Sequence, residues 1–249
     1  MKSFNDKNYL VFAGTSTIAK KLIKILKDFN TNVFFTSRDE HKASLIKEEF
    51  GYKYEICDDL SNFENVQKIF HSTKNHFNKI DGIINFAGSI LIKPAHQTSY
   101  DEYFDVISKN LTTNFAITKY AASYMPHGGS VVFISSIAAT VGISNHEAIS
   151  LAKSGIEGLV RSAACTYATQ NIRFNCVSPS LTDTNLSKSI TKNEMMLKIS
   201  KKMHALGRIG KADDIARACS FLLNPDNNWI TGQILNVDGG FSLKSKITI

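Results

Sequence analysis

The chain has 249 residues, of which 43% are hydrophobic and 20% are charged. This length and apolar content suffice to bury a core, which excludes an intrinsically disordered chain. With only 14 Gly and 4 Pro, the composition also excludes a collagen-like chain. No apolar run approaches the roughly 18–20 residues that cross a bilayer, and no signal-peptide stretch begins the chain. We therefore expect a soluble, cytoplasmic globular protein with no membrane partner.

Short apolar runs alternate with longer amphipathic segments along the whole chain. We predict strands over residues 9–13, 32–36, 52–57, 80–86, 130–135, 173–178 and 233–237. We predict helices over residues 18–29, 61–77, 100–124, 148–169 and 211–223. The continuous apolar character of the strands indicates burial on both faces. The pattern predicts an α/β fold: one Rossmann-type domain spanning residues 1–249, with a doubly wound parallel sheet of about seven strands and helices on both faces.

The net charge of +7 raises the question of a nucleic-acid partner. The lysines are dispersed, however, and their densest group has helical spacing, which is typical of a solvated helix face. These lysines are Lys20, Lys21, Lys24 and Lys27. We therefore predict no nucleic-acid partner. The four cysteines lack metal-ligand spacing, so we predict no metal site and expect small buried thiols.

The first predicted strand, turn and helix form a candidate phosphate site, because a helix N-terminus offers free N–H groups and a positive dipole end. The candidate cofactor contacts there are Gly14, Thr15, Ser16, Thr17 and Ile18. The second strand ends in Ser37 and Arg38. An NAD site usually carries an acid near this position, whereas an Arg beside a small residue suits a 2′-phosphate. The pair favours NADP (NADPH) over NAD; the alternative is a solvated surface arginine.

Further polar elements follow the later strands. They are Asn85-Phe86-Ala87-Gly88, Asn110, Ser135-Ser136, Lys153, Asn175-Cys176-Val177-Ser178-Pro179 and the segment 229–240. With these elements, residues 9–243 resemble the short-chain dehydrogenase/reductase family. Within it they are most similar to the carbonyl-reductase branch that contains 3-oxoacyl-(acyl carrier protein) reductases.

The resemblance implies cofactor-binding roles for several residues. Asp59, followed by Leu60, matches the acid that meets the adenine ring. Asn85, Ala87 and Gly88 match the family's Asn-Asn-Ala-Gly element, although phenylalanine replaces its second Asn. The turn at residues 12–19 corresponds to the glycine-rich cofactor loop, but its glycines are replaced by Ala, Thr and Ala here. The resemblance therefore predicts a nucleotide-binding loop that departs from the usual pattern.

The resemblance also implies catalytic residues. Asn110 matches the helix residue that supports a water in the proton relay, and Ser136 matches the serine that hydrogen-bonds the reacting oxygen. Lys153 matches the lysine that holds the nicotinamide ribose. Pro179 and Thr184 match groups beside the nicotinamide, although a serine follows the proline where glycine is usual.

The family's proton donor, a tyrosine four residues before the lysine, is replaced. Counting back four from Lys153 and forward thirteen from Ser136 both give Ile149. Isoleucine has no ionisable group and cannot donate a proton. His146 lies seven residues before Lys153, the interval at which related enoyl reductases place their tyrosine, and it is either a replacement acid or a solvated loop histidine.

Two functions from different classes follow. The first is an NADP(H)-dependent oxidoreductase acting on a small-molecule carbonyl or hydroxyl substrate, with water, His146 or Lys153 supplying the proton. The second is a catalytically inactive nucleotide-binding, sensing or scaffold protein. An enoyl reductase relative is a third, less favoured interpretation, because Asn85 to Gly88 follow the carbonyl-reductase pattern.

The resemblance also predicts a lid and self-association. Residues 185–206 correspond to the family's substrate lid. The predicted helices at 100–124 and 148–169 usually pair with their copies across a two-fold axis. We therefore expect a homodimer or homotetramer.

Overall fold

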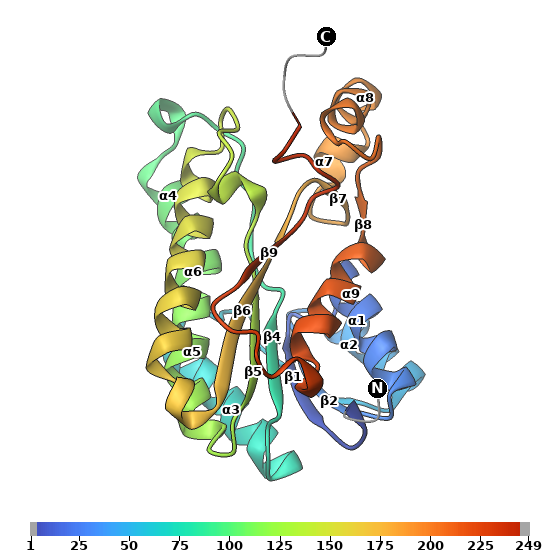
Figure 1. Cartoon of the computed structure of the whole chain (residues 1–249), viewed down its shortest axis with the longest axis vertical. Helices are drawn as coiled ribbons and strands as arrows, with labels where there is room; N and C mark the ends of the chain where they lie inside the picture. Colours follow the sequence, from blue (N-terminus) through green and yellow to red (C-terminus); the bar gives the residue numbers. More distant parts are fainter. Residues whose placement is uncertain (1–3, 245–249) are drawn as a thin grey trace.

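Seven strands form one parallel sheet in the order β3-β2-β1-β4-β5-β6-β9 (Figure 1). The computed structural model describes residues 4–244. The strands are β1 (Asn8–Phe12), β2 (Asn32–Ser37), β3 (Lys53–Ile56), β4 (Gly82–Asn85), β5 (Gly129–Ile134), β6 (Ile172–Pro179) and β9 (Ile234–Val237). A separate parallel pair consists of β7 (Thr182–Asp183) and β8 (Gly210–Lys211). The predicted α/β fold with a doubly wound seven-stranded sheet is confirmed.

Helices cover both faces of the sheet (Figure 1). One face carries α1 (Thr17–Asp28), α2 (Glu40–Phe50) and α9 (Ala212–Leu223), and the other carries α3 (Phe63–Phe77), α5 (Thr113–Tyr124) and α6 (Glu147–Thr166). The remaining helices are α4 (Tyr100–Ile107), α7 (Lys188–Thr191) and α8 (Glu194–Met203). A π-helical turn (Ser108–Thr112) joins α4 to α5, and 3₁₀ turns occupy Ala95–Gln97, Ile137–Ala139, Ala168–Gln170 and Pro225–Asn227.

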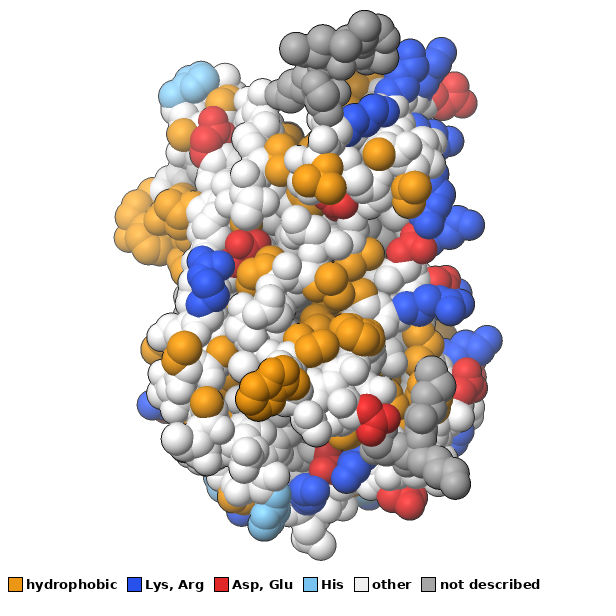
Figure 2. Space-filling view, viewed as in Figure 1, with side chains coloured by type: hydrophobic (Ala, Val, Ile, Leu, Met, Phe, Trp, Pro, Cys, Tyr) orange, Lys and Arg blue, Asp and Glu red, His pale blue; other side chains and the backbone are white. Residues whose placement is uncertain are grey.

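The first helix shows how the sequence selects its packing. Leu22, Ile23 and Leu26 are fully buried on one side of α1, against the sheet and α9. The four lysines predicted to lie on a solvated face, at positions 20, 21, 24 and 27, are all exposed. Figure 2 shows basic and acidic side chains interspersed along the side where Figure 1 places α1, α8 and α9. The charge is therefore dispersed over the surface.

Some elements differ from the sequence prediction. Helix α2 is absent from it, because only Ala43 and Ile46 of this helix are buried and the apolar periodicity is weak. The predicted helix at 100–124 is interrupted by the π-helical turn. Cys165 is exposed on the outer side of α6, whereas the other three cysteines are buried as expected. Within residues 4–244, no helix is long and apolar enough to span a bilayer.

Candidate active site

The carboxyl ends of the parallel strands meet at one edge of the sheet and bring most predicted site residues together. Every strand of the seven-stranded sheet runs parallel to its neighbours. The residues at or just beyond these ends are Gly14, Ser37, Arg38, Asp59, Leu60, Asn85, Ala87, Gly88, Ser136 and Pro179. Asn110 lies in the π-helical turn and Lys153 lies on α6, and both reach the same edge through hydrogen bonds.

The loop after β1 is fixed to β2. The backbone N–H of Ala13 donates to Oγ1 of Thr36 at 3.0 Å, and that of Gly14 donates to the Thr36 carbonyl at 2.8 Å. A Cβ on Gly14 would lie 2.7 Å from Cβ of Phe35, so glycine is required there by close packing. Ala13 has φ of +53°, in the left-handed region that favours glycine. The backbone at Ala13 is therefore strained.

The N-terminus of α1 follows this loop and suits an anionic group. The Ser16 side chain caps the helix by accepting from the backbone N–H of Ala19. The Thr15 and Ser37 hydroxyls lie 3.1 Å apart. Oγ1 of Thr17 accepts from the backbone N–H of Asn185 at 3.2 Å, so the candidate cofactor loop contacts the start of the predicted lid. Ile18, the next residue, is half-buried.

The end of β2 presents a cation rather than an acid. Arg38 is exposed, and no ion pair joins it to another residue of the described part of the chain. The neighbouring carboxylate, Asp39, accepts from the backbone N–H of Lys42 at 3.0 Å and pairs with its ammonium at 2.6 Å. These bonds lower the pKa of Asp39. Asp39 is therefore engaged in capping α2, whereas Arg38 is available to a ligand.

Asp59 lies beside a shallow cavity beyond β3. Its Oδ1 accepts from the backbone N–H of Ser61 at 2.8 Å and from the Ser61 hydroxyl at 2.6 Å, and these bonds lower its pKa. The adjacent Leu60 is half-buried against the core. The cavity has a volume of about 280 Å³ and is lined by Glu55, Ile56, Cys57, Asp58, Asp59, Asn65 and Lys68.

Three buried asparagines link β4 to the helices behind the site. Nδ2 of Asn85 donates to Oδ1 of Asn114 at 2.9 Å, and Nδ2 of Asn114 donates to the Asn110 carbonyl at 2.6 Å. Oδ1 of Asn85 accepts from the backbone N–H of Ala87 at 2.8 Å, which shapes the loop after β4. Nδ2 of Asn110 donates to Oγ of Ser89 at 3.1 Å. Sequence reasoning missed Asn114, although its spacing of four from Asn110 was a usable signal.

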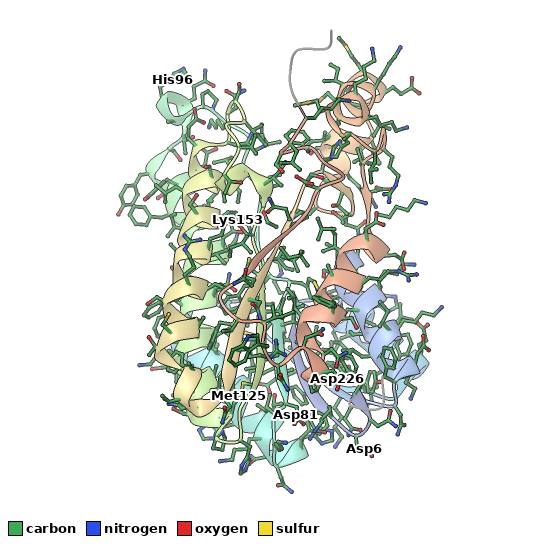
Figure 3. All side chains as sticks on the ribbon, viewed as in Figure 1. Asp6, Asp81, His96, Met125, Lys153 and Asp226 are labelled. Atoms are coloured by element: carbon green, nitrogen blue, oxygen red, sulfur yellow. The ribbon has the colours of Figure 1, made fainter. Side chains whose placement is uncertain are left out.

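Lys153 reaches from α6 to the end of β5 (Figure 3). Its Nζ donates to the Ile134 carbonyl at 3.0 Å. Burial lowers the pKa of its ammonium from 10.5 to about 8. A Cβ on Gly88 would lie 3.6 Å from this nitrogen and 2.8 Å from Oδ1 of Asn110, so these three residues surround one point. Ser136, two residues beyond Ile134, is half-buried and its Oγ accepts from the backbone N–H of Ala138 at 3.2 Å.

Ile149 and His146 precede Lys153 on the same helix. Ile149 is 4% exposed and belongs to a small apolar cluster. The cluster contains Val106, Ala148, Ile149 and Ala152, with Leu91, Tyr103 and Ile107 packed against it. His146 is half-buried at the N-cap of α6, where its Nδ1 lies 2.8 Å from the Ser144 carbonyl. Ile149 thus contributes an apolar side chain one helical turn before Lys153 on α6.

The loop after β6 is tied to the C-terminal end of α8. Oγ of Ser187 lies 3.2 Å from the Thr184 hydroxyl and accepts from the Thr184 backbone N–H. The hydroxyl of Ser180, the residue after Pro179, lies 2.8 Å from Nε2 of His204. Nδ1 of His204 lies 2.6 Å from the Ser200 carbonyl. Sequence reasoning missed His204, because nothing in the local pattern marks it as buried.

Comparison with known proteins agrees with this geometry. A family model described as enoyl-(acyl carrier protein) reductase matches residues 12–242. The chain belongs to the short-chain dehydrogenase/reductase family. The solved structure of a short-chain type dehydrogenase/reductase from Mycobacterium ulcerans is 28% identical and superposes with a TM-score of 0.92, covering 97% of this chain and 92% of that one. The predicted family is therefore confirmed.

Two further relatives of this short-chain dehydrogenase/reductase bear on its chemistry. Carbonyl reductase family member 4 of Xenopus laevis is 30% identical, covering 94% of this chain and 97% of that protein. The structure of ElxO with NADP bound is 28% identical and has a TM-score of 0.88, covering 96% of this chain and all of that one. Proteins similar to this chain therefore include one named as a carbonyl reductase and one whose structure has NADP bound.

Proposed function

We propose that this short-chain dehydrogenase/reductase is an NADP(H)-dependent oxidoreductase that interconverts a carbonyl and a hydroxyl group on a small molecule. The observation that carries the proposal is the convergence of Lys153, Asn110 and Gly88 at the carboxyl edge of the sheet. The nicotinamide, when bound, would supply or accept the hydride. The chain's own residues would hold the cofactor, orient the substrate oxygen and supply its proton.

The residues at the edge fit a phosphorylated dinucleotide. The α1 N-terminus with Thr15 and Ser16 would face the pyrophosphate, and Asp59 would meet the adenine. Arg38 would bind the 2′-phosphate, because its guanidinium is uncommitted while Asp39 caps α2. Glycine at position 14 lets the loop pack closely against β2, since a Cβ there would clash with Phe35. The NADP-bound structure of ElxO supports the same preference.

The nicotinamide end would lie against Lys153 and the loop after β6. Lys153 would hold the ribose, Pro179 and Thr184 would flank the ring, and the Ser136 hydroxyl would polarise the reacting oxygen. We place Ile149 where the family has its tyrosine. The proton would then come from water near Asn110, from His146 or from Lys153.

The second candidate is a catalytically inactive nucleotide-binding protein that acts as a sensor or scaffold. The strained backbone at Ala13 favours this candidate. Alanine at a φ of +53° lacks the conformational freedom that glycine would give the loop. Loss of the acid at Ile149 is consistent with it. Under this proposal NADPH would bind without turnover, or would not bind at all.

Self-association is proposed through α4, α5 and α6. Phe104, Phe115 and Leu151 are 43%, 53% and 51% exposed on these helices, and Tyr100 is 74% exposed. Figure 2 shows an apolar cluster on the side where Figure 1 places α4. A two-fold axis would bury such a face in a dimer, or in a tetramer with further axes. Light scattering that gives only a monomer would contradict this.

Calorimetric titration with NADPH and NADH separates the candidates. We expect NADPH to bind more tightly, and Arg38→Ser to weaken NADPH binding about 10- to 100-fold with NADH binding unchanged. Lys24→Ser, an exposed change on α1, is the control. Binding followed by NADPH oxidation with ketones or aldehydes supports the oxidoreductase. Binding without oxidation across a broad carbonyl panel supports the sensor, and no binding supports the scaffold.

We also propose that the protein resides in the cytoplasm, which cell fractionation would test.

A further inference from the structure

Helices α7 and α8 carry the predicted lid beyond the carboxyl edge of the sheet (Figure 1). Neither helix contains a buried residue. On α8, Met195, Met196 and Ile199 are 74%, 45% and 50% exposed. A segment that buries so few side chains gains little from packing, so single hydrogen bonds contribute a large share of its local stability.

Hydrogen bonds at both ends hold this lid. At the far end, Nε2 of His204 lies 2.8 Å from the Ser180 hydroxyl. At the near end, the backbone N–H of Asn185 donates to Oγ1 of Thr17 at 3.2 Å. Thr17 is the first residue of α1. The near end of the lid is therefore tied directly to the candidate cofactor loop.

The chain around Asn185 is a closed turn. Ser187 is 7% exposed, and its Oγ accepts from the backbone N–H of Thr184 at 3.1 Å and donates to the Thr182 carbonyl. These bonds restrict the backbone on both sides of Asn185. The turn thus presents the Asn185 N–H to Thr17 with little further loss of conformational entropy.

The Thr17 hydroxyl keeps its own hydrogen for a second partner. A hydroxyl offers one donor and two acceptor lone pairs, and the bond from Asn185 uses one lone pair. Within residues 4–244 the Thr17 hydroxyl donates to no other residue. The side chain lies in the first turn of α1, where the backbone N–H groups lack partners inside the helix and favour an anion. The hydroxyl can therefore donate to an anion there while it accepts from the lid.

We propose that Thr17 is a positioning residue that couples the lid to the cofactor. Its lone pair holds the Asn185 N–H, and its hydrogen is donated to the pyrophosphate. The inference rests on the proposed function for the identity of the anion, and it goes beyond that function by linking the anion to the lid. A phosphate oxygen fixes the hydroxyl rotor and polarises its oxygen, which strengthens the bond from Asn185. The coupling is reciprocal, so a held lid also favours the bound cofactor.

Hydrogen–deuterium exchange of the whole chain, measured by peptide mass spectrometry, tests the proposal. In the unliganded protein, Thr17→Val is expected to speed amide exchange in residues 185–191 about 2- to 10-fold, because valine has a similar shape but accepts no hydrogen bond. Thr17→Ser keeps the hydroxyl and should exchange at the wild-type rate. Exchange in α2 is the internal control, and circular dichroism checks folding. Thr17→Gly, which also lacks the hydroxyl, is the second variant if valine perturbs the helix.

NADPH tests the coupling. Saturating NADPH is expected to slow exchange in residues 185–191 at least about twofold more in the wild type and Thr17→Ser than in Thr17→Val. Equal exchange of the valine variant and the wild type without ligand would overturn the bond's role in holding the lid. Equal slowing by NADPH would overturn the coupling, and a serine variant that behaves like valine would overturn both. No NADPH binding in calorimetry would contradict the proposed function and the coupling, while the unliganded comparison would still decide whether Thr17 holds the lid.

Discussion

Replacing Lys153 by methionine is expected to stabilise the fold near neutral pH. Lowering the pKa of this amine from 10.5 in the unfolded chain to about 8 in the folded one costs the folded state about 3 kcal/mol at pH 7. Methionine has a similar length and no charge, so Lys153→Met removes this cost. It also leaves the Ile134 carbonyl without its donor, which costs about 1 kcal/mol. The net gain expected at pH 7 is about 2 kcal/mol.

The sign of the pH dependence follows from the depressed pKa. Below about pH 8 the amine is protonated in both states, and the folded state bears the full cost. Between pH 8 and 10.5 the folded protein releases the proton first, so the wild type gains stability as the pH rises. The advantage of the methionine variant should therefore shrink by about 2 kcal/mol between pH 7 and 9.5.

Urea unfolding of both proteins at these two pH values measures the difference, and the other titrating groups cancel in it. A methionine variant that is less stable than the wild type at pH 7 would refute the reasoning. So would a stability difference that is the same at both pH values. Either result would mean that the ammonium is solvated or paired in the folded protein.

Three further substitutions have defined outcomes. Asn114→Ala removes two buried hydrogen bonds and should cost about 2–4 kcal/mol in urea unfolding, whereas a loss below about 0.5 kcal/mol would contradict the asparagine network. Gly14→Ala places a Cβ 2.7 Å from Phe35 and should cost about 1–3 kcal/mol in thermal unfolding, while Gly142→Ala, with nothing within 4 Å, should be nearly neutral. Ile149→Tyr should raise carbonyl reduction about 10²- to 10⁴-fold, and no gain despite intact NADPH binding would contradict the assignment of that position.

The sequence predicted what depends on apolar periodicity and on strand ends. Seven short apolar runs predicted the strands of the sheet, and residues just beyond them, such as Ser136 and Arg38, had to meet at one edge once the strands were parallel. It did not predict α2, because a helix that buries few side chains leaves a weak pattern, even though Asp39 caps its start and Gly51 its end. Reading caps together with periodicity would have found this helix.

Contacts between distant segments were not predictable from local patterns. The hydrogen bond between Thr17 and Asn185 joins residues 168 positions apart in the sequence. The hydrogen bond between His204 and Ser180 joins residues 24 positions apart. The sequence marks each of these side chains as an ordinary polar residue. Their roles arise only when β6, α8 and the loop after β1 are folded against one another. The contact between Asn110 and Asn114 could have been predicted from the sequence, because residues four positions apart lie on the same face of a helix.

The π-helical turn between α4 and α5 determines how the side chains of α4 are rotated about the helix axis relative to those of α5. Thr113 bonds back to Ser108, so the turn holds one residue more than an α-helical turn. One residue corresponds to about 100° of rotation on a helix. Deleting a residue here would let a regular helix run through, and it would swing either α4 or Asn110 out of its present direction. The length of this turn therefore determines whether Asn110 can bond to Ser89 in the loop after β4.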